Sequence, residues 1–516
     1  MFKIFSFDSN RIHNLINKAN DIAEPSKTFN VHGRTVKWVD GRHYEKQELE
    51  NYRLVGDVEL DNILDLIAKS SKEDDVTFTN LIQQCANVYQ RVESSLKEGK
   101  IRIQDMKLSE AESAMYDFYH HYHDNLPEID FDQIQRGIDV FIQYSFVAGL
   151  ALYYLALVPG FGIPKIAKVL EYTRYLAPPS TSEQVKTRLL DTGGFISTVM
   201  LPEEGSQLSA SSLRPGSKGW TMALQVRTLH AKVRRKILKK MKSSWDIQEY
   251  GIPINQEDMA ATLLAFSVNV IAGIEYITAK PMDKQEQLDY LALWRYIGWL
   301  LGVETVESKN CDPNYQNASR SKLAPIDPCG TRPDGQRSDS PIIHSRSTLE
   351  SIIIHLMEPN DSSKKIVKHL LSVGQPATET SPSNLSSTRS KTSNSSVMYL
   401  YRCYMCRLHV GDNLADALDI PQINYFSWKS LMAVTLSRTI LSIFRILFLV
   451  MMVSSSIKKK MFQYQFNMMG KFSKFWTSSH GKRMDKAAKK AMKSKQSMCP
   501  FSVAWTDESA THSKLD

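Results

Sequence analysis

The 516-residue sequence lacks most of the motifs on which common enzyme classes depend. Its six cysteines are too sparse for a disulfide scaffold. It contains no phosphate-binding Gly-x-x-x-x-Gly-Lys-Ser/Thr loop, no Gly-x-Ser-x-Gly nucleophile turn and no His-Glu-x-x-His zinc helix. These absences argue against P-loop nucleotide hydrolases, α/β-type serine hydrolases and zinc peptidases.

Alternation of apolar and polar residues is also rare, and no convincing strand pair appears. Apolar residues recur instead at spacings of three and four, and 42% of the chain is hydrophobic, which is ample for a core. The sequence therefore predicts an all-α protein, with helices listed here by their expected bounds: 165–176, 184–200, 219–243, 256–279 and 285–303.

Composition divides the chain into three regions. Residues 1–52 are predicted to be a polar lead-in, residues 53–473 a single large helical bundle domain, and residues 474–516 a basic mobile tail. Within the domain, residues 306–345 and 374–397 are rich in small polar residues, so we expect disordered insertions there. The N-terminus lacks a sustained apolar run, and no secretory signal is expected.

Two segments are apolar enough to raise the question of a membrane. Residues 131–158 contain several small residues that suit close helix packing, so a buried central helix is predicted, with a spanning helix as the alternative. Residues 429–456 contain Arg438 and Arg445, and an arginine at mid-bilayer costs roughly 2.5–3.5 kcal/mol. An in-plane amphipathic helix is the better prediction there.

The net charge of +9 is concentrated in residues 232–242 and 457–495. Such clusters suit anionic lipid, phosphate or nucleic acid. No nucleic-acid-binding motif accompanies them, so nucleic acid is not expected, and a membrane surface stays open as a partner.

Two groups of metal-type ligands give weak signals. Cys403 and Cys406 form a Cys-x-x-Cys pair without a second pair, so ordinary reduced cysteines are expected. His120 and His123 share a helix face but have no carboxylate at the usual spacing, which favours a solvated helix end.

The stretch "LQVRTLHAKVRRKIL" places a histidine on an apolar helix face. Val226, His230, Val233 and Ile237 fall at i, i+4, i+7 and i+11, so this face should point to the core. Taken alone, such a histidine is most often a hydrogen-bonded core residue. Arg234 lies one turn further on and shares part of the same face.

Arg188 and Arg295 are single cations at inward-looking positions of two other apolar helices. Burying an arginine is costly without an anionic partner, so each implies a carboxylate or a bound anion. A neutral imidazole in an apolar pocket with nearby arginines is what a b-type haem requires.

Several short blocks, in the same order, resemble the shared catalytic domain of bacterial rubber oxygenases (latex-clearing proteins) and of the ER-bound oxygenase of mycophenolic acid biosynthesis. The blocks are "LVGDVELDNIL", "LPEIDFDQIQRGIDVFIQYSFVAGL", "RLLDTGGF", "VRTLHAKVRRKI", "GIPINQEDMAATLLAFS" and "WRYIGWLLGV". The resemblance covers roughly residues 53–305 and implies a mostly helical domain around a non-covalent haem b.

The resemblance also implies roles for particular residues. His230 matches the family's axial iron ligand and Arg234 its companion arginine, with Arg295 as a further pocket residue. Arg188 and Thr192 match the distal Arg-x-x-x-Thr pair, where a polar group would face bound O₂.

Two more positions, Glu171 and Asp191, concern the catalytic chemistry that the resemblance implies. Glu171 lies near the place of a glutamate suggested as a base. Asp191 stands where rubber oxygenases carry a lysine, so the distal chemistry and rubber itself as the substrate stay open.

The function expected from this resemblance is a haem-dependent oxygenase that uses O₂ to cleave or oxidise a C=C bond in an apolar, isoprenoid-like chain. One alternative is a non-catalytic haem- or lipid-binding helical protein associated with membranes. Another is a structural protein in which His230 is an ordinary core residue. The sequence leaves open the substrate, the oligomeric state, and whether the protein is ER-bound, otherwise membrane-associated or cytoplasmic.

Overall fold

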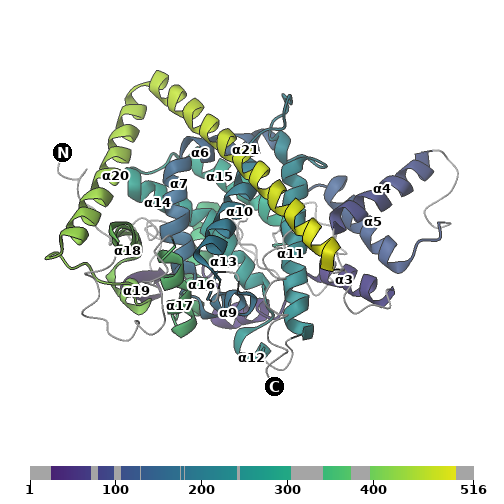
Figure 1. Ribbon diagram of the computed structural model, residues 1–516, viewed down its shortest axis with the longest axis horizontal. Helices are drawn as coiled ribbons and strands as arrows, with labels where there is room; N and C mark the ends of the chain where they lie inside the picture. Colours follow the sequence, from purple (N-terminus) through teal and green to yellow (C-terminus); the bar gives the residue numbers. More distant parts are fainter. Residues whose placement is uncertain are drawn as a thin grey trace.

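The computed structural model describes residues 25–70, 80–97, 106–127, 129–174, 176–178, 180–240, 245–303, 341–373 and 396–494. Almost all of their regular structure is helical (Figure 1), which confirms the predicted all-α class. The predicted insertions lie almost wholly outside these residues, as does the chain beyond Ser494.

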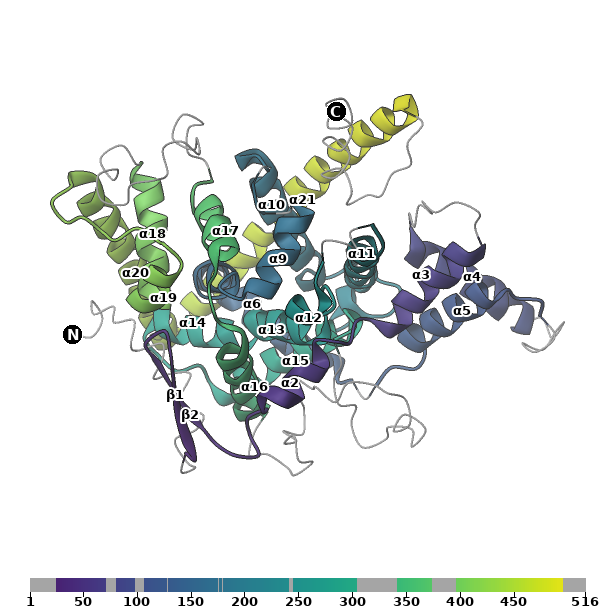
Figure 2. The same ribbon diagram turned by 90° about the horizontal axis from the view of Figure 1, so that it is seen from below.

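A short β-hairpin precedes the helices and corrects the expectation that no strands pair. Strand β1 (Lys27–Val31) pairs antiparallel with β2 (Arg34–Trp38), and helix α2 (Lys46–Tyr52) follows. The turn between the strands is His32-Gly33, both with positive φ. A two-residue turn with positive φ at both residues matches the twist of a hairpin. The sequence signal for these two strands was therefore confined to a few residues. The hairpin lies beside α16 at the edge of the body (Figure 2).

The next three helices form a projection on one side of the molecule (Figures 1 and 2). They are α3 (Val58–Ser70), α4 (Leu81–Lys97) and α5 (Glu110–His123). Helix α5 begins with a capping box in which Ser109 and Glu112 satisfy each other's backbone N–H groups. Helices α4 and α5 pack on each other, and α3 joins this pair to the main body through α11.

The long helix predicted for residues 131–158 is bent by 80°. It consists of α6 (Phe131–Gln143), α7 (Ser145–Ala151), the π-helical turn η4 (Leu152–Leu157) and α8 (Val158–Gly160). The bend is held by side chains distant in sequence. Tyr144 Oη donates to Glu286, and Gln465 accepts from the backbone N–H and the hydroxyl of Ser145. The prediction of one continuous buried helix over residues 131–158 was therefore wrong about its continuity.

Helices α9, α10 and α11 carry most of the candidate site. Their observed bounds are α9 (Pro164–Thr173), α10 (Ser182–Met200) and α11 (Lys218–Lys240), with the short turns η5 (Ser211–Leu213) and α12 (Ile247–Tyr250) between or after them. Helix α10 starts two residues before its predicted start because Thr181 and Gln184 form a capping box.

The central layer is formed by α13 (Gln256–Phe266), α14 (Val268–Thr278) and α15 (Lys284–Leu300). Residues 256–279 were predicted as one helix, but Ser267 interrupts it, and the carbonyl of Phe266 accepts a hydrogen bond from Tyr290 instead. Large side chains here are fully enclosed, among them Tyr276, Tyr290 and Trp294.

The C-terminal part adds six helices around this layer: α16 (Pro341–Leu356), α17 (Asp361–Leu371), α18 (Val397–Val410), α19 (Asp412–Ala417), α20 (Trp428–Val453) and α21 (Ser455–Ser494). Helix α20 forms an outer edge, and α21 runs diagonally across the face of α10 (Figure 1). Helix α21 continues past residue 474, where a mobile tail was expected to begin. It is held there by Trp476, which packs directly over Gly194.

Replacing Gly194 by alanine should loosen α21, because the new Cβ would overlap the indole ring of Trp476. We expect amide hydrogen exchange to be about ten-fold faster over residues 472–483, with the far-UV circular dichroism almost unchanged. Gly470→Ala is the matched control, since a Cβ there meets no atom within 4 Å. Equal exchange in both variants would contradict the packing of α21 on α10.

Candidate functional site

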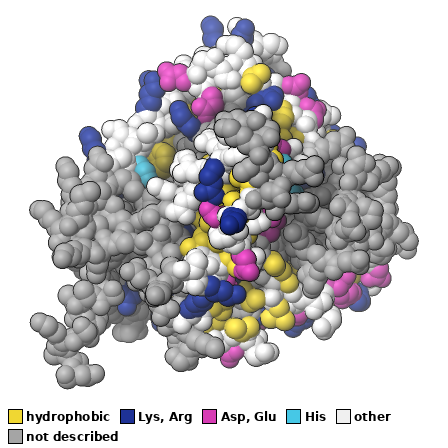
Figure 3. Space-filling model, turned by 90° about the vertical axis from the view of Figure 1, so that its right-hand side faces the viewer, with side chains coloured by type: hydrophobic (Ala, Val, Ile, Leu, Met, Phe, Trp, Pro, Cys, Tyr) yellow, Lys and Arg dark blue, Asp and Glu magenta, His cyan; other side chains and the backbone are white. Residues whose placement is uncertain are grey.

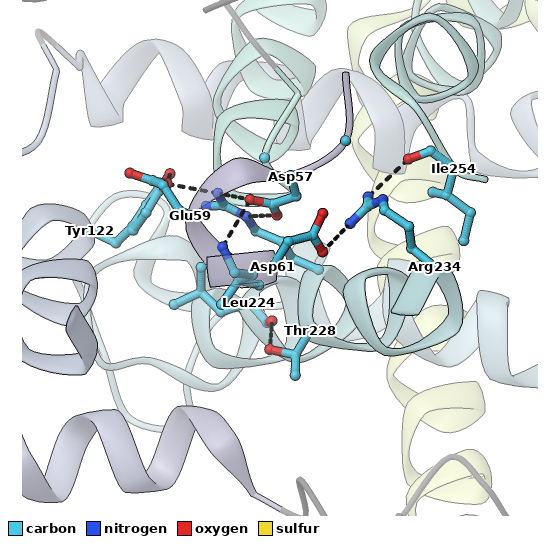
Figure 4. Close-up of polar contacts among 12 residues, drawn as sticks. Asp57, Glu59, Asp61, Tyr122, Leu224, Thr228, Arg234 and Ile254 are labelled. Atoms are coloured by element: carbon cyan, nitrogen blue, oxygen red, sulfur yellow. Dashed lines mark hydrogen bonds and ion pairs between the residues drawn. The ribbon is translucent and has the colours of Figure 1, made fainter. Parts of the chain in front are cut away.

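The family-like blocks converge on the arginines of α11. The chain before and within α3 contacts α11 through ion pairs, and the segment before α13 contacts both of them (Figure 4). At the start of α13, Gln256 donates to the carbonyls of Gly56 and Gly302, at 3.2 and 2.9 Å. Stretches separated by up to 250 residues in sequence therefore share one polar cluster.

Arg227 is the centre of this cluster. Its Nε and Nη2 donate to the two carboxylate oxygens of Asp57, at 2.5 and 2.8 Å, and Nη2 also donates to Glu59 at 2.8 Å. Its guanidinium lies 4.8 Å from the ring centroid of Tyr122. Burial alone would raise the pKa of Asp57, but Arg227 more than offsets this and lowers it. The pair is thus ionised, bidentate and almost fully removed from water.

Arg234 is one of the predicted cofactor-binding residues, and protein groups occupy its nitrogens. Nη1 pairs with Asp61 at 2.8 Å, while Nε and Nη2 donate to the carbonyls of Pro253 and Ile254 (Figure 4). These contacts fasten α11 both to α3 and to the segment before α13. A role for Arg234 on a haem propionate stays a prediction.

Two glycines let the chain pass close to these arginines. Gly302 has φ +77°, and a Cβ there would lie 2.8 Å from Asp57 Oδ2. At Gly56 a Cβ would lie 2.8 Å from Arg234 Nε. Any larger residue at either position would therefore displace a charged partner.

Sequence reasoning did not single out Arg227 or its partners. A signal was nevertheless present, because Arg227 and Arg234 are seven residues apart and Asp57 and Asp61 are four apart. Both spacings place charges on one helix face. Nothing in the sequence indicated that the two faces meet.

His230 projects from α11 between these two arginines in sequence. Its Nδ1 is buried and has no hydrogen-bond partner within the part of the chain that the structure describes. Burial, together with Arg234, lowers the pKa of His230 to about 4, so its imidazole is neutral. The ring nevertheless keeps some solvent exposure, as do Val226 and Val233 on the same face. His230 is therefore not the hydrogen-bonded core histidine of the simplest interpretation.

Helices α10 and α11 touch each other where their ends adjoin. A Cβ on Gly219 would lie 3.0 Å from Val199 Cα, so the two helices touch at their adjoining ends. His230 follows Gly219 by eleven residues and Arg188 precedes Val199 by eleven, roughly 16 Å along each helix. His230 and Arg188 are therefore each about three helical turns from this contact, on neighbouring helices.

The predicted distal residues have contacts within the protein. Arg188 is buried, and its Nη1 donates to the carbonyl of Arg174 at 2.6 Å, at the C-terminal end of α9. Thr192 is exposed, and its hydroxyl donates back to the carbonyl of Arg188. Their roles toward O₂ stay predictions.

Asp191, the departure from the rubber-oxygenase pattern, belongs to the contact between α10 and α21. Its Oδ1 accepts from Trp476 Nε1 at 2.9 Å and from Arg483, and His480 lies 3.7 Å away. Partial burial would raise its pKa, but hydrogen bonds from His480 and Trp476 and the charge of Arg483 lower it. Asp191 therefore fastens α21 over α10.

Glu171 and Arg295 lie on other helices. The carboxylate of Glu171 accepts from Ser362 at 2.8 Å and Lys168 at 3.0 Å. Partial burial alone would raise the pKa of Glu171, but these two hydrogen bonds outweigh it and lower the pKa, which makes this carboxylate a weak base. Arg295 is half-buried on α15, which packs against α11.

A second buried cluster adjoins the first and was not predicted. The ring of His355 lies between two carboxylates, 2.6 Å from Glu257 and 2.9 Å from Glu50. Beside it, burial and the charge of Glu257 raise the pKa of Asp258 to about 7. Asp258 can therefore hold or release a proton near neutral pH. Acidic residues are ordinary in a first helical turn, so the sequence carried no signal that these would be buried.

The described residues contain no group of three or more His, Cys, Asp or Glu side chains arranged for a metal ion. This applies to sites built wholly from protein ligands. An iron held in a porphyrin needs as few as one, so His230 alone is relevant to that chemistry.

Replacing Asp57 by asparagine should be strongly destabilising, because Arg227 would stay buried without its charged partner. We expect a loss of about 3–5 kcal/mol in the free energy of unfolding, measured by denaturant titration. Asp65→Asn is the control, since Asp65 pairs with Lys239 and Arg235 at the surface, and its loss should be about 1 kcal/mol or less. Similar losses in both variants would contradict the central place given to Arg227.

Comparison with known proteins adds two findings. No curated protein sequence matches the chain. A solved structure of latex clearing protein LCP in the closed state aligns over 85% of this chain and 93% of its own, with 12% identity and a TM-score of 0.45.

Residues 142–314 match the family described as "ER-bound oxygenase mpaB/B'/Rubber oxygenase, catalytic domain". This segment includes α9, α10, α11 and the central helices α13–α15, and hence all six predicted site residues. Residues 142–314 are therefore similar to the mpaB and rubber oxygenase catalytic domain family, which is the family that the sequence motifs resemble.

Proposed function

We propose that this protein is a haem b-dependent oxygenase that uses O₂ to cleave or oxidise a C=C bond in an apolar, isoprenoid-like chain. The observation that carries the proposal is His230. It is a neutral, partly exposed imidazole with an unbonded Nδ1, inside the segment that matches an oxygenase family.

The residues of this chain fit a b-type haem at the axial position. Iron takes a neutral imidazole nitrogen, and the low pKa of His230 supplies one throughout the physiological pH range. The apolar neighbours Val226 and Val233 are only partly covered by protein, which suits a face that receives a flat apolar group. When bound, haem would supply the activation of dioxygen.

Other residues of the chain hold His230 in position. Arg227 and Arg234 fix α11 against α3 and the start of α13, which sets the direction in which His230 projects. By the resemblance, Arg188 and Thr192 on α10 would serve the side of the haem that binds O₂, and Arg295 on α15 would be a further residue that holds the haem. Glu171 would serve as a base only if substrate binding displaced Ser362 and Lys168 from its carboxylate.

The second candidate is a helical protein that binds haem or lipid without turnover. The exposure of Thr192 and the engagement of Asp191 by α21 favour it, because both leave fewer polar groups on the proposed distal side. Oxygen uptake separates the two candidates.

The purified protein should show a haem Soret band, and His230→Ala should abolish it while the helical circular dichroism stays. His120→Ala, a substitution at a half-buried helix end, is the matched control and should keep the band. A folded wild-type protein that takes up no haem would overturn the proposal. If haem binds, oxygen uptake with a short polyisoprenoid is expected to be abolished in His230→Ala, and a lack of uptake in the wild type would favour the non-catalytic binder.

The stability of the haem-free protein should fall in mild acid because of His230. Its pKa is about 4 in the folded chain and about 6.5 when unfolded, so the unfolded state binds the proton first. As the pH falls from about 6.5 to 4, the wild type should lose up to about 1.4 kcal/mol per pH unit more than His230→Leu. Parallel curves of unfolding free energy against pH in the two proteins would show that His230 is not held neutral.

A further inference from the structure

Helix α20 presents large apolar side chains to solvent in both its N-terminal and its C-terminal half. These exposed side chains define the outer face of α20: Trp428, Leu431, Met432, Leu436, Ile443, Ile446, Val450 and Val453. Monomeric soluble proteins rarely leave so extended an apolar surface uncovered, so a partner is expected here.

The opposite face of α20 is bound to the protein. Arg445 is fully buried and donates to the carbonyls of Ile277 and Tyr276, at the C-terminal end of α14. Arg438 is exposed, but its Nε donates to Tyr404 Oη at 3.1 Å. The two arginines that made a spanning helix costly are thus used to hold α20 lengthwise against the body.

Among the described residues, α20 is one of two helices long and apolar enough to cross a membrane by length and composition, or three if the bent α6–α8 segment is counted. The other, Gln256–Thr278 (α13 and α14 taken together), has an apolar window that is 83% buried in the protein, whereas the apolar window of α20 is only 28% buried. The exposed apolar surface is therefore a property of α20 in particular.

The charge around this face has one sign. Residues 420–484 contain ten lysines and arginines and no aspartate or glutamate. Exposed lysines follow α20 directly, at Lys458, Lys459 and Lys460, and recur along α21 at Lys471 and Lys474. On the side of the molecule away from α20, cations and carboxylates are interspersed (Figure 3).

The aromatic side chains also gather here. Tyr425, Phe426 and Trp428 are exposed where α20 begins, and aromatic residues of this kind prefer the boundary between lipid headgroups and acyl chains. Where α20 meets α21, Phe146, Leu447, Met461 and Tyr464 line an apolar groove that adds to the same side of the molecule.

We propose that the outer face of α20 lies flat in the surface of a membrane rich in anionic lipid, with Lys458, Lys459 and Lys460, where α21 begins, at the headgroups. Apolar burial and attraction to anionic lipid act together in such in-plane helices. A second copy of this chain fits less well as the partner, because it would bring the same exposed lysines to this face.

The test is flotation of the purified full chain with lipid vesicles. The wild type should float with vesicles containing about one-third phosphatidylserine, and at least about ten-fold less with phosphatidylcholine alone. The triple substitution Leu436→Ser, Ile443→Ser and Ile446→Ser should reduce binding about ten-fold, and Lys458→Gln, Lys459→Gln and Lys460→Gln should remove most of the lipid preference.

The control is Leu208→Ser with Met398→Ser, which removes exposed apolar side chains elsewhere and should leave flotation unchanged. The proposal is overturned if the wild type does not float, or if the triple serine variant floats as well as the wild type. It is also overturned if the protein resists extraction by alkaline carbonate, which indicates a spanning helix, or forms a lipid-free dimer that the serine variant disperses. Flotation requires no haem, so this result is independent of the proposed oxygenase.

Discussion

The ion pairs between α11 and the chain around α3 are the interaction on which the candidate site depends. Arg227 and Arg234 are both almost fully buried, and neither is tolerable in the core without the carboxylates of Asp57 and Asp61. The same contacts bring the segment before α13 and the end of α15 to α11, through Ile254, Gln256 and Gly302. His230 takes its position from this arrangement, because it projects from the turn of α11 between the two arginines.

Three groups of polar contacts hold the helices against one another. The arginines of α11 join the N-terminal projection to the body. Asp191 joins α10 to α21 through Trp476 and Arg483, and Arg445 joins α20 to the end of α14. Each places a charge where burial would be costly unless one particular partner were present. The predicted site residues Arg188 and Arg234 turn out to have such structural contacts as well.

The proposed site and the proposed membrane face lie on connected elements. Helix α20 leads directly into α21, and α21 covers α10, which carries Arg188 and Thr192. The proposed membrane face and the candidate residues are therefore linked only through α21, because α20 forms an outer edge of the molecule and packs on α14 and α18 (Figure 1).

The sequence by itself determined the helical class, most helix bounds near α9–α11 and the helix face that carries His230, because helix periodicity and capping are local signals. It also pointed to the unusual cations. Only the tertiary structure decided what those cations bind, since the partner of Arg227 lies 170 residues away. The breaks at Tyr144 and Ser267 depend likewise on side chains from distant helices, as does the docking of α21. Among the described residues His230 Nδ1 has no hydrogen-bond partner. This follows from the packing around α11, which the local sequence pattern does not predict.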